Sequence, residues 1–320
     1  MTGKLNLIIL LLFFVGCQNE PSKSHLFTKK ENGKLVFTLD DQPILSYQYD
    51  ILYPPEGVDS IFKRSGFIHP LKTLAGHTLT QIHPKDHWHH FGIWNPWTQV
   101  LFKGDTLDFW NIGGGGATIR FAGFKKIDSN SNSITMTALH EHVVLRKDSD
   151  EVALNELQTL TVTRGNDDYY LLDLKFEYNC ATDSPLKILK HRYAGLGWRA
   201  TEAWNATNSE VLSSKGYTRD NVDGTTGRWC IVQGALGTDY GGIVMLSHPD
   251  NYNYPEPLRI WPKDQHEGAV FANFAPTKTK DWLLKPDSTY ILKYRMVVFD
   301  GKVNADKAEK WWKEFSTTVQ

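Results

Sequence analysis

Apolar and polar residues alternate along most of this 320-residue chain. Alternation with a period of two is typical of strands that have one buried face and one solvated face. Clusters of Gly, Asn, Asp and Pro, such as those at 147–150, 165–168 and 285–288, interrupt the alternation and predict turns. The pattern predicts strands at residues 34–39, 44–53, 117–124, 133–145, 151–163, 169–179, 186–198, 229–236, 241–248 and 289–299.

Only the C-terminal end of the chain has a helical pattern. Asn304 can cap a helix there, and Ala308, Trp311, Trp312 and Phe315 fall on one face of it. Many long strands with almost no helices between them favour an all-β fold, a large antiparallel β-sandwich followed by one α-helix. No linker divides the chain, so we predict a single domain at residues 33–320.

The N-terminal segment predicts export. An apolar run at 7–15 follows Lys4, and it is shorter than the roughly 20 residues that a membrane-spanning helix needs. Gly16 before Cys17 resembles a lipoprotein signal, which implies cleavage before Cys17 and lipidation of its sulfur; the alternative is an ordinary signal peptide with an incidental cysteine. We therefore expect a signal at 1–17, a tether at 18–32, and a domain held at the cell envelope by a lipid anchor alone, at an outer membrane facing the periplasm or the exterior.

Composition narrows the range of partners. The formal net charge is −1 and no cluster of Lys and Arg is present, which argues against nucleic acid as a partner. The chain has 11 Trp, and tryptophan both packs cores and stacks on the apolar faces of sugar rings. Cys180 and Cys230 are predicted to be separate thiols, although an oxidising compartment would permit a bridge.

Polar residues stand in the apolar rows of two predicted strands. Glu156 and Gln158 lie in the row that contains Leu154 and Leu160, and the preceding strand has His140 and His142 in its apolar row. A buried carboxylate is costly unless it is paired or lines a wet cavity. If the strands are neighbours, these groups can converge on one concave site; the alternatives are a structural ion pair for Glu156 and core hydrogen bonds for the others. His191 and Arg192 pose the same question in the strand predicted at 186–198.

The segment "HPKDHWHHFGIWNPW" at 83–97 holds four histidines, one aspartate and three tryptophans. Its prolines and glycine disfavour a helix, and on an extended path His87 and His89 would point one way and His90 the other. Asp86 beside His87 can fix the imidazole tautomer, which suits both acid–base chemistry and metal binding. Catalytic or substrate-binding imidazoles, a metal site and simple packing all stay open.

Several segments together resemble the PmoA-like domain family of unknown function. They are "RSGFIHPL", "PKDHWHHFGIW", "LDFW", "KHRYAGLGWRA", "GGIVMLSHPDNYNYPEPLRIW" and "YRMVVFDG", and the resemblance runs from about residue 35 to the end. It implies a β-supersandwich of the galactose-mutarotase-like kind, whose members bind carbohydrate in a cleft and include epimerases that use a His acid and a Glu base. It also implies an exported protein of glycan degradation.

The candidate residues lie in stretches that match the family, but the resemblance carries no catalytic assignment, so their roles are predicted from side-chain chemistry. We predict as catalytic residues His87, His89, Glu156 and His191. We predict as substrate-binding residues His69, Asp86, His90, Trp94, Arg192, His248, Asn251 and Arg259. No cofactor is predicted, and a divalent metal at the His83–His90 cluster is the alternative.

Three hypotheses follow for the function. The first is an enzyme that acts on a sugar or uronate by His/Glu general acid–base chemistry, as an epimerase, lyase or hydrolase. The second is a glycan-binding lipoprotein without catalysis. The third is a mononuclear metal enzyme with histidine ligands.

Overall fold

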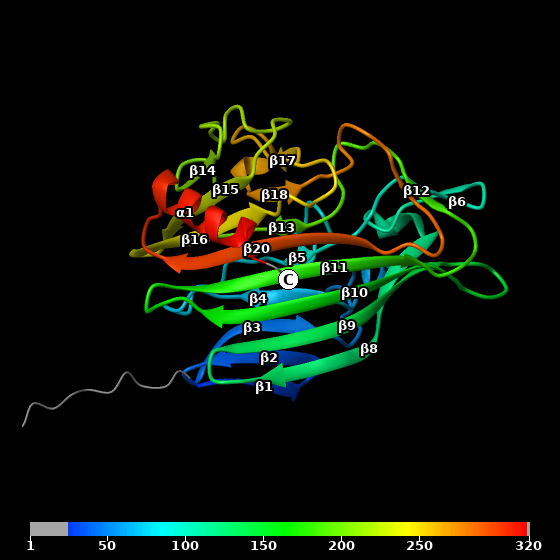
Figure 1. The fold of residues 1–320 in the computed structure, drawn as a ribbon, viewed down its shortest axis with the longest axis horizontal. Helices are drawn as coiled ribbons and strands as arrows, with labels where there is room; N and C mark the ends of the chain where they lie inside the picture. Colours follow the sequence, from blue (N-terminus) through cyan, green and yellow to red (C-terminus); the bar gives the residue numbers. More distant parts are fainter. Residues whose placement is uncertain (1–24, 319–320) are drawn as a thin grey trace, which may run out of the picture.

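The computed structural model describes residues 25–318, and its strands form two large sheets and one small sheet (Figure 1). The first sheet has eight strands, in the order β1 (Leu26–Glu31), β2 (Lys34–Leu39), β3 (Gln42–Gln48), β4 (Phe67–Leu71), β5 (Ile93–Trp94), β13 (Gly197–Arg199), β18 (Phe271–Phe274) and β17 (Leu258–Ile260).

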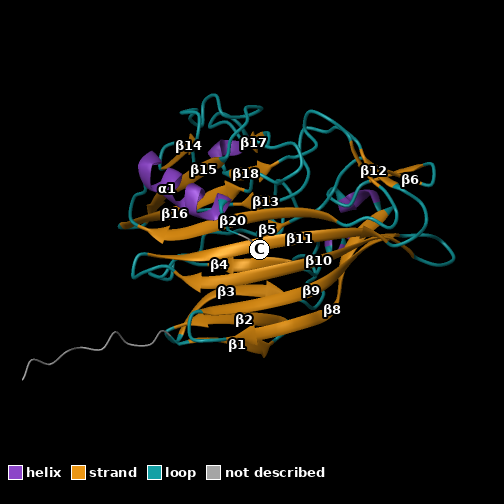
Figure 2. Cartoon of the chain, in the orientation of Figure 1, coloured by secondary structure: helices purple, strands orange, loops and turns teal. Residues whose placement is uncertain are grey.

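The second large sheet also has eight strands, and a third sheet has four. The second is ordered β14 (Ser209–Ser213), β15 (Trp229–Leu236), β16 (Asp239–Ser247), β20 (Tyr290–Asp300), β11 (Tyr169–Cys180), β10 (Glu151–Arg164), β9 (Ser133–Val144) and β8 (Ala117–Ser129). The third is ordered β19 (Trp282–Leu284), β12 (Leu186–Ile188), β6 (Val100–Phe102) and β7 (Asp105–Leu107). The predicted all-β fold of large antiparallel sheets with a C-terminal helix is confirmed (Figure 2).

The main core lies between the two large sheets. Alternate residues of β10 and β11 point into it, such as Leu160 and Leu174, and Leu45 of β3 reaches it from the first sheet. Tyr170 of β11 crosses the core and donates a hydrogen bond to the carbonyl of Lys72, 2.7 Å away. The face-to-face arrangement follows from the period-two pattern, because each sheet has one apolar face to remove from water.

The far half of the first sheet is covered on both faces. On β5, Ile93 belongs to the main core, whereas the next residue, Trp94, packs in a separate aromatic layer on the opposite face. This aromatic layer consists of Phe67, Phe91, Trp94, Trp110, Ile112, Trp261 and Phe271. Gly197 of β13 lies beneath it, and a Cβ there would come within 2.9 Å of the Trp110 ring. The glycine therefore lets the tryptophan lie flat on the sheet, which prepares the floor of the cavity described below.

The helix α1 (Ala305–Ser316) covers the outer face of the second sheet (Figure 2). Asn304 caps it, accepting a hydrogen bond from the backbone of Lys307. Trp311 and Phe315 pack on Trp229 of β15, and Trp312 is half-buried at the edge of the same cluster. The cap and the apolar face predicted from the sequence are confirmed.

Three sequence predictions need correction or limits. Residues 26–31, which the sequence assigns to the tether, form β1 and pair with β2, because Leu26 is buried in the main core. The strand predicted at 186–198 consists of β12 and β13 with a loop between them. The predicted signal at 1–17, with Cys17, lies outside the described residues.

Cys180 and Cys230 are both free thiols, as predicted. Within residues 25–318, no helix combines the length and hydropathy required to cross a membrane.

Candidate functional site

A cavity of about 280 Å³ opens above the aromatic layer of the first sheet. Segments that lie far apart in the sequence build its wall: the turn at 86–90, the loop after β7, the loop before β13, β17, and the loop between β17 and β18. Its lining residues are His87, His89, His90, Trp110, Asn111, Arg192, Tyr193, Arg259, Trp261, Gln265, His266 and Phe271. Three imidazoles of one short turn thus share a cavity with two arginines and an aromatic wall.

The backbone of residues 83–90 folds into a compact double turn. The amide of His87 donates to the carbonyl of Pro84 at 2.9 Å, the amide of His90 donates to the carbonyl of His87 at 3.0 Å, and the amide of His83 closes the loop on the carbonyl of His90 at 2.9 Å. The rings of His87 and His90 therefore stack at 4.6 Å, and His89 lies 4.9 Å from His90. The expectation that His90 points away from its neighbours is wrong, because the turn brings all three rings to one side.

Asp86 connects this turn to β13. Its Oδ2 lies 2.9 Å from Nδ1 of His87, and its Oδ1 lies 3.1 Å from Nη2 of Arg199, a side chain that is itself buried. Burial alone would raise the pKa of the Asp86 carboxyl, but Arg199 and His87 outweigh this effect and lower it. The carboxylate is therefore ionised and held in place beside the imidazole.

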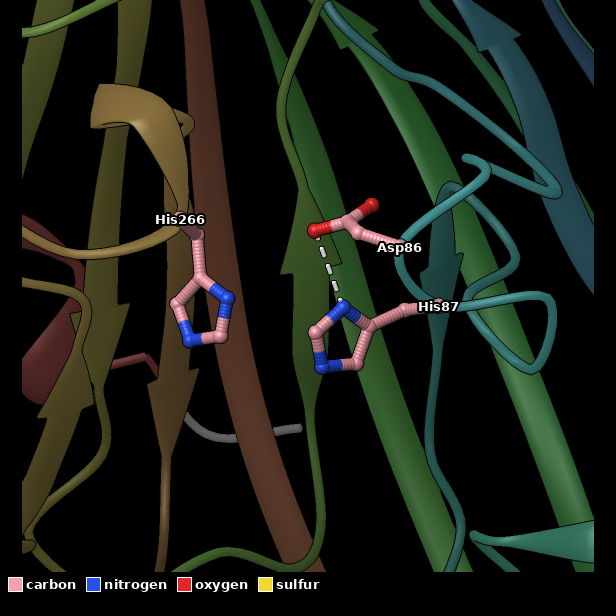
Figure 3. Close-up of side chains that lie close together, drawn as sticks. All are labelled: Asp86, His87 and His266. Atoms are coloured by element: carbon pink, nitrogen blue, oxygen red, sulfur yellow. Dashed lines mark ion pairs between the residues drawn. The ribbon is translucent and has the colours of Figure 1, made fainter.

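A further imidazole, His266, comes from the loop between β17 and β18 (Figure 3). Its ring stacks on Trp261 at 3.7 Å between centroids and lies 5.1 Å from the ring of His87. The backbone of His266 and Glu267 has positive φ, 49° and 56°, a conformation that is costly outside glycine. We missed His266 in the sequence because it stands in a polar loop with no strand pattern around it.

The name cavity histidine cluster is used below for Asp86, His87, His89, His90 and His266. Within residues 25–318, His87 pairs through Nδ1 with Asp86, whereas the rings of His89, His90 and His266 make no side-chain hydrogen bond, and Nδ1 of His90 is buried without a partner. Burial lowers the pKa of His90 and of His266, and burial together with the neighbouring His87 lowers the pKa of His89 to about 4. These three rings are therefore neutral near pH 7 and offer free lone pairs.

Two arginines bring positive charge to the cavity wall. Arg259 of β17 pairs with Asp223 at 2.6 Å. Arg192 lies over the Tyr193 ring at 5.3 Å and has no carboxylate partner within the described part of the chain. Arg192 is thus free to bind an anionic group of a ligand.

A small polar network stabilises the part of the cavity wall that contains Trp110, Asn111 and Tyr193. Asp108 accepts hydrogen bonds from the backbone amides of Trp110 and Asn111, at 2.8 and 2.7 Å. The side-chain amide of Asn111 donates to Asp108 at 2.7 Å and to the hydroxyl of Tyr193 at 2.9 Å. Asp108 therefore fixes the orientation of three cavity-lining residues without lining the cavity itself.

Glu156 is not part of this site, contrary to the sequence hypothesis. It is 1% exposed, lines none of the cavities found among the described residues, and lies in the main core opposite His140 of β9 and Tyr178 of β11. Nε2 of His142 donates to its Oε2 at 2.8 Å, and Nδ1 of His140 lies 3.6 Å from its Oε1. The prediction that the inward row of β10 carries polar groups was correct, but those groups converge inside the core.

The name core histidine cluster is used below for Tyr47, His140, His142 and Glu156. The Tyr47 hydroxyl is hydrogen-bonded to Nε2 of His140, which links the two large sheets. Burial alone would raise the pKa of Glu156, but its hydrogen bonds with His140 and His142 outweigh burial and lower it to about 2. Glu156 therefore has a structural role, but its partner His142, whose pKa burial lowers, is a hydrogen-bond donor and not a cation.

Five other candidates also lie away from the cavity. His69 is bonded through Nδ1 to the Thr80 hydroxyl at 2.9 Å, and His191 packs edge-on against Tyr193 from behind. Trp94 is buried in the aromatic layer beneath His90. His248 packs against Phe315 of α1, and Asn251 donates to Glu256 at 3.0 Å inside the fold. These side chains support loops and strands and do not face the cavity.

The geometry also admits a metal ion. One ligand atom each from Asp86, His87 and His266 lies within 4.8 Å of the others, and Figure 3 shows the three side chains facing one another. The metal alternative in the sequence concerned the His83–His90 cluster. The set found here retains two of its residues and adds His266, whereas His83 faces away, its Nε2 bonded to the carbonyl of Phe62 at 3.1 Å.

Comparisons with known proteins place the chain by family. A model of the family described as "Family of unknown function (DUF6807)" matches residues 34–313, whereas the sequence resemblance pointed to a family of unknown function under the PmoA-like name. A search of curated proteins finds no match.

Solved structures with a similar course of the chain have low identity. A heparan sulfate lyase HepC mutant from Pedobacter heparinus is similar at a TM-score of 0.38 and 10% identity, over 88% of this chain and 36% of that one. A GalM/aldose epimerase homologue from C. elegans is similar at a TM-score of 0.36 and 8% identity, over 88% of this chain and 100% of that one. Heparinase III is similar at a TM-score of 0.35 and 9% identity, over 89% of this chain and 36% of that one. The chain thus spans about a third of the length of the lyase and of heparinase III.

Proposed function

The chain belongs to the DUF6807 family of unknown function, and from the chemistry of its cavity we propose that it acts on an acidic sugar. The proposal rests on one observation: a single cavity is lined by aromatic residues, two arginines and several imidazoles. Aromatic faces bind the apolar side of a sugar ring, and arginine binds a carboxylate through paired N–H donors. A uronate presents both groups to the protein.

The unpaired arginine favours a charged ligand over a neutral one. Arg259 is already neutralised by Asp223, but Arg192 is exposed and has no carboxylate partner within residues 25–318. A ligand carboxylate at Arg192 would place the sugar ring against Tyr193 and Trp110, the neighbouring members of the wall.

Two imidazoles stand where they can transfer protons to or from such a ligand. His87 is held beside the Asp86 carboxylate, which orients its imidazole, and His89 is neutral near pH 7. Glu156 takes no part, because it is sealed in the core. The proposed chemistry is therefore imidazole acid–base catalysis of epimerisation or elimination, in place of the His/Glu pair expected from the sequence.

A panel of uronate and neutral oligosaccharides tests the proposal. We expect turnover of a uronate-containing member by the wild-type protein and a loss of at least a hundredfold in His89→Ala. His69→Ala is the matched control, since its imidazole is bonded to Thr80 outside the cavity. Binding of a uronate without turnover by any variant or by the wild type would instead assign a glycan-binding role, and no binding at all would refute the proposal.

We also propose that the protein is exported and attached to the cell envelope through a lipid on Cys17, with the outer membrane as the site. The apolar run at 7–15 followed by Gly16 and Cys17 supports this. Incorporation of labelled palmitate into the wild-type protein but not into Cys17→Ala is the expected result, and equal labelling of the two would contradict it.

A further inference from the structure

We propose that Asp86, His87 and His266 hold one divalent transition-metal ion at the edge of the cavity. The residues come from two separate segments, the 83–90 turn and the loop between β17 and β18, and their ligand atoms converge within 4.8 Å (Figure 3). Two imidazoles and a carboxylate form a ligand set that zinc and related ions bind, and three protein ligands leave positions open for water or substrate.

The spacing of the first two ligands already matches a filled site. Zinc binds nitrogen and oxygen at about 2.0–2.2 Å, so that adjacent ligand atoms lie roughly 3 Å apart. Oδ2 of Asp86 and Nδ1 of His87 are 2.9 Å apart, close enough to bind one ion together. The exposed ring of His266 completes the set by closing on this pair.

The surroundings orient each ligand. Arg199 binds both oxygens of Asp86, at 3.1 and 3.3 Å, and fixes the plane of the carboxylate. Trp261 stacks on His266 at 3.7 Å, and the imidazole of His266 faces Asp86 and His87 (Figure 3). Outer contacts of this kind orient ligands in metal sites.

The metal would separate the roles of two neighbouring histidines. If His87 is a ligand, two imidazoles of the turn remain at the cavity, His89 and His90. Of these, only His89 is partly exposed, so we assign proton transfer to His89. The ion itself would bind the ligand's carboxylate or hydroxyl from the edge of the cavity. The metal site stands whether or not the ligand is an acidic sugar.

Titration of the chelator-treated full-length protein with Zn²⁺ alone, and with Co²⁺ followed by visible absorption, tests the proposal without any sugar. We expect one ion per chain, a Co²⁺ spectrum of nitrogen and oxygen ligands, and an affinity at least a hundredfold weaker in His266→Ala. Since His266 is exposed, this variant should unfold at the same temperature as the wild type.

His77→Ala is the matched control. His77 forms an imidazole–carboxylate pair with Asp239 at 2.7 Å on the surface, outside the cavity, so this variant should keep the wild-type affinity within twofold. Equal Zn²⁺ affinity in wild-type protein and His266→Ala, or equal losses in His266→Ala and His77→Ala, would overturn the proposal. Metal binding without uronate turnover would leave it standing and reject only the proposed function.

Discussion

The core histidine cluster and the cavity histidine cluster use the same side chains for opposite purposes. In the core, Glu156 is ionised and hydrogen-bonded to His142, and His140 links it to Tyr47 across the sheets. In the cavity, four imidazoles lie within ring-contact distance, and within the described residues only His87 has a polar side-chain partner, the Asp86 carboxylate.

The difference lies in what each set of groups bonds to. A polar group that is sealed inside a protein generally bonds to the protein, because water is absent and an unpaired group is costly, although Nδ1 of His142 in the core cluster also lacks a partner. A polar group that borders a cavity can stay unpaired and remain available to a ligand. Unused hydrogen-bonding capacity at a cavity is therefore a better sign of function here than the presence of histidine and glutamate in a strand.

The largest expected effect is the loss of stability when the core histidine cluster is disrupted. Glu156→Gln removes the buried charge that His142 and His140 contact and that lies in the field of the buried Arg64, so it should lower the free energy of unfolding by about 3–5 kcal/mol. Chemical denaturation measures this. Glu141→Gln, which breaks a surface pair with Arg120 on the outer face of β9, should cost about 0–1 kcal/mol. Similar losses of unfolding free energy in the two variants would show that the burial of Glu156 does not increase its contribution to stability.

The same carboxylate predicts an acid limit of stability. Its pKa is about 2 in the folded protein against an ordinary value of 4.5, so its stabilising contribution is complete above pH 4.5 and is lost as the pH falls toward 2. Urea denaturation between pH 5 and pH 2.5 should show the wild type losing stability faster than Glu156→Gln. Parallel curves for the two proteins would contradict the ionised state of Glu156.

A matched pair of ring replacements compares the clusters directly. His142→Phe removes the donor to Glu156, and a lost hydrogen bond to a charged group should cost about 2–3 kcal/mol. His90→Phe removes only an unpaired nitrogen from a ring already packed on Trp94 and Phe271, so stability should change by less than about 1 kcal/mol. Thermal or urea unfolding of both variants measures these changes. A larger loss of stability in His90→Phe than in His142→Phe would contradict the assignment of a structural role to the core cluster and not to the cavity cluster.

The smallest expected effect concerns ligand affinity alone. Arg192→Ala should weaken binding of an acidic sugar by about tenfold, equivalent to about 1.4 kcal/mol, since the arginine offers its charge to the cavity. Stability should stay within about 0.5 kcal/mol because the side chain is exposed. Isothermal titration with a uronate and its neutral parent sugar separates charge from shape, and an equal loss for both ligands would argue against carboxylate recognition.

The fold was accessible from the sequence to a large extent. Strand alternation located β2, β8, β9, β10, β11, β15, β16 and β20 closely, and the Asn304 cap and apolar face located α1. Short strands such as β5, β13 and β17 were missed or merged, since two or three residues do not show a period. These same short strands carry the cavity, so the sequence was least informative where the site lies.

The candidate site was found in part. Asp86 and His87, with the two histidines that follow Trp88, were identified from their density in one segment. Arg192 was identified from its place in a predicted strand, and Arg259 from the family resemblance. His266, Trp261 and Arg199 were missed, because each stands alone in its segment. Glu156 was assigned to the site since a carboxylate in an apolar row has two physical explanations, a cavity or a buried partner, and the row itself does not distinguish them.

By itself, the sequence determined which residues face inward along each long strand, because the side-chain period of a strand is a local property of the backbone. It also showed that the imidazole-rich segment at 83–90 is not helical, but the turn that brings its rings together was seen only in the structure. Only the tertiary structure decided which polar groups meet. Contacts of His87 with His266, or of Glu156 with His142, depend on how strands and loops distant in the chain pack, and the free energy of that packing comes from the whole core and not from any one segment.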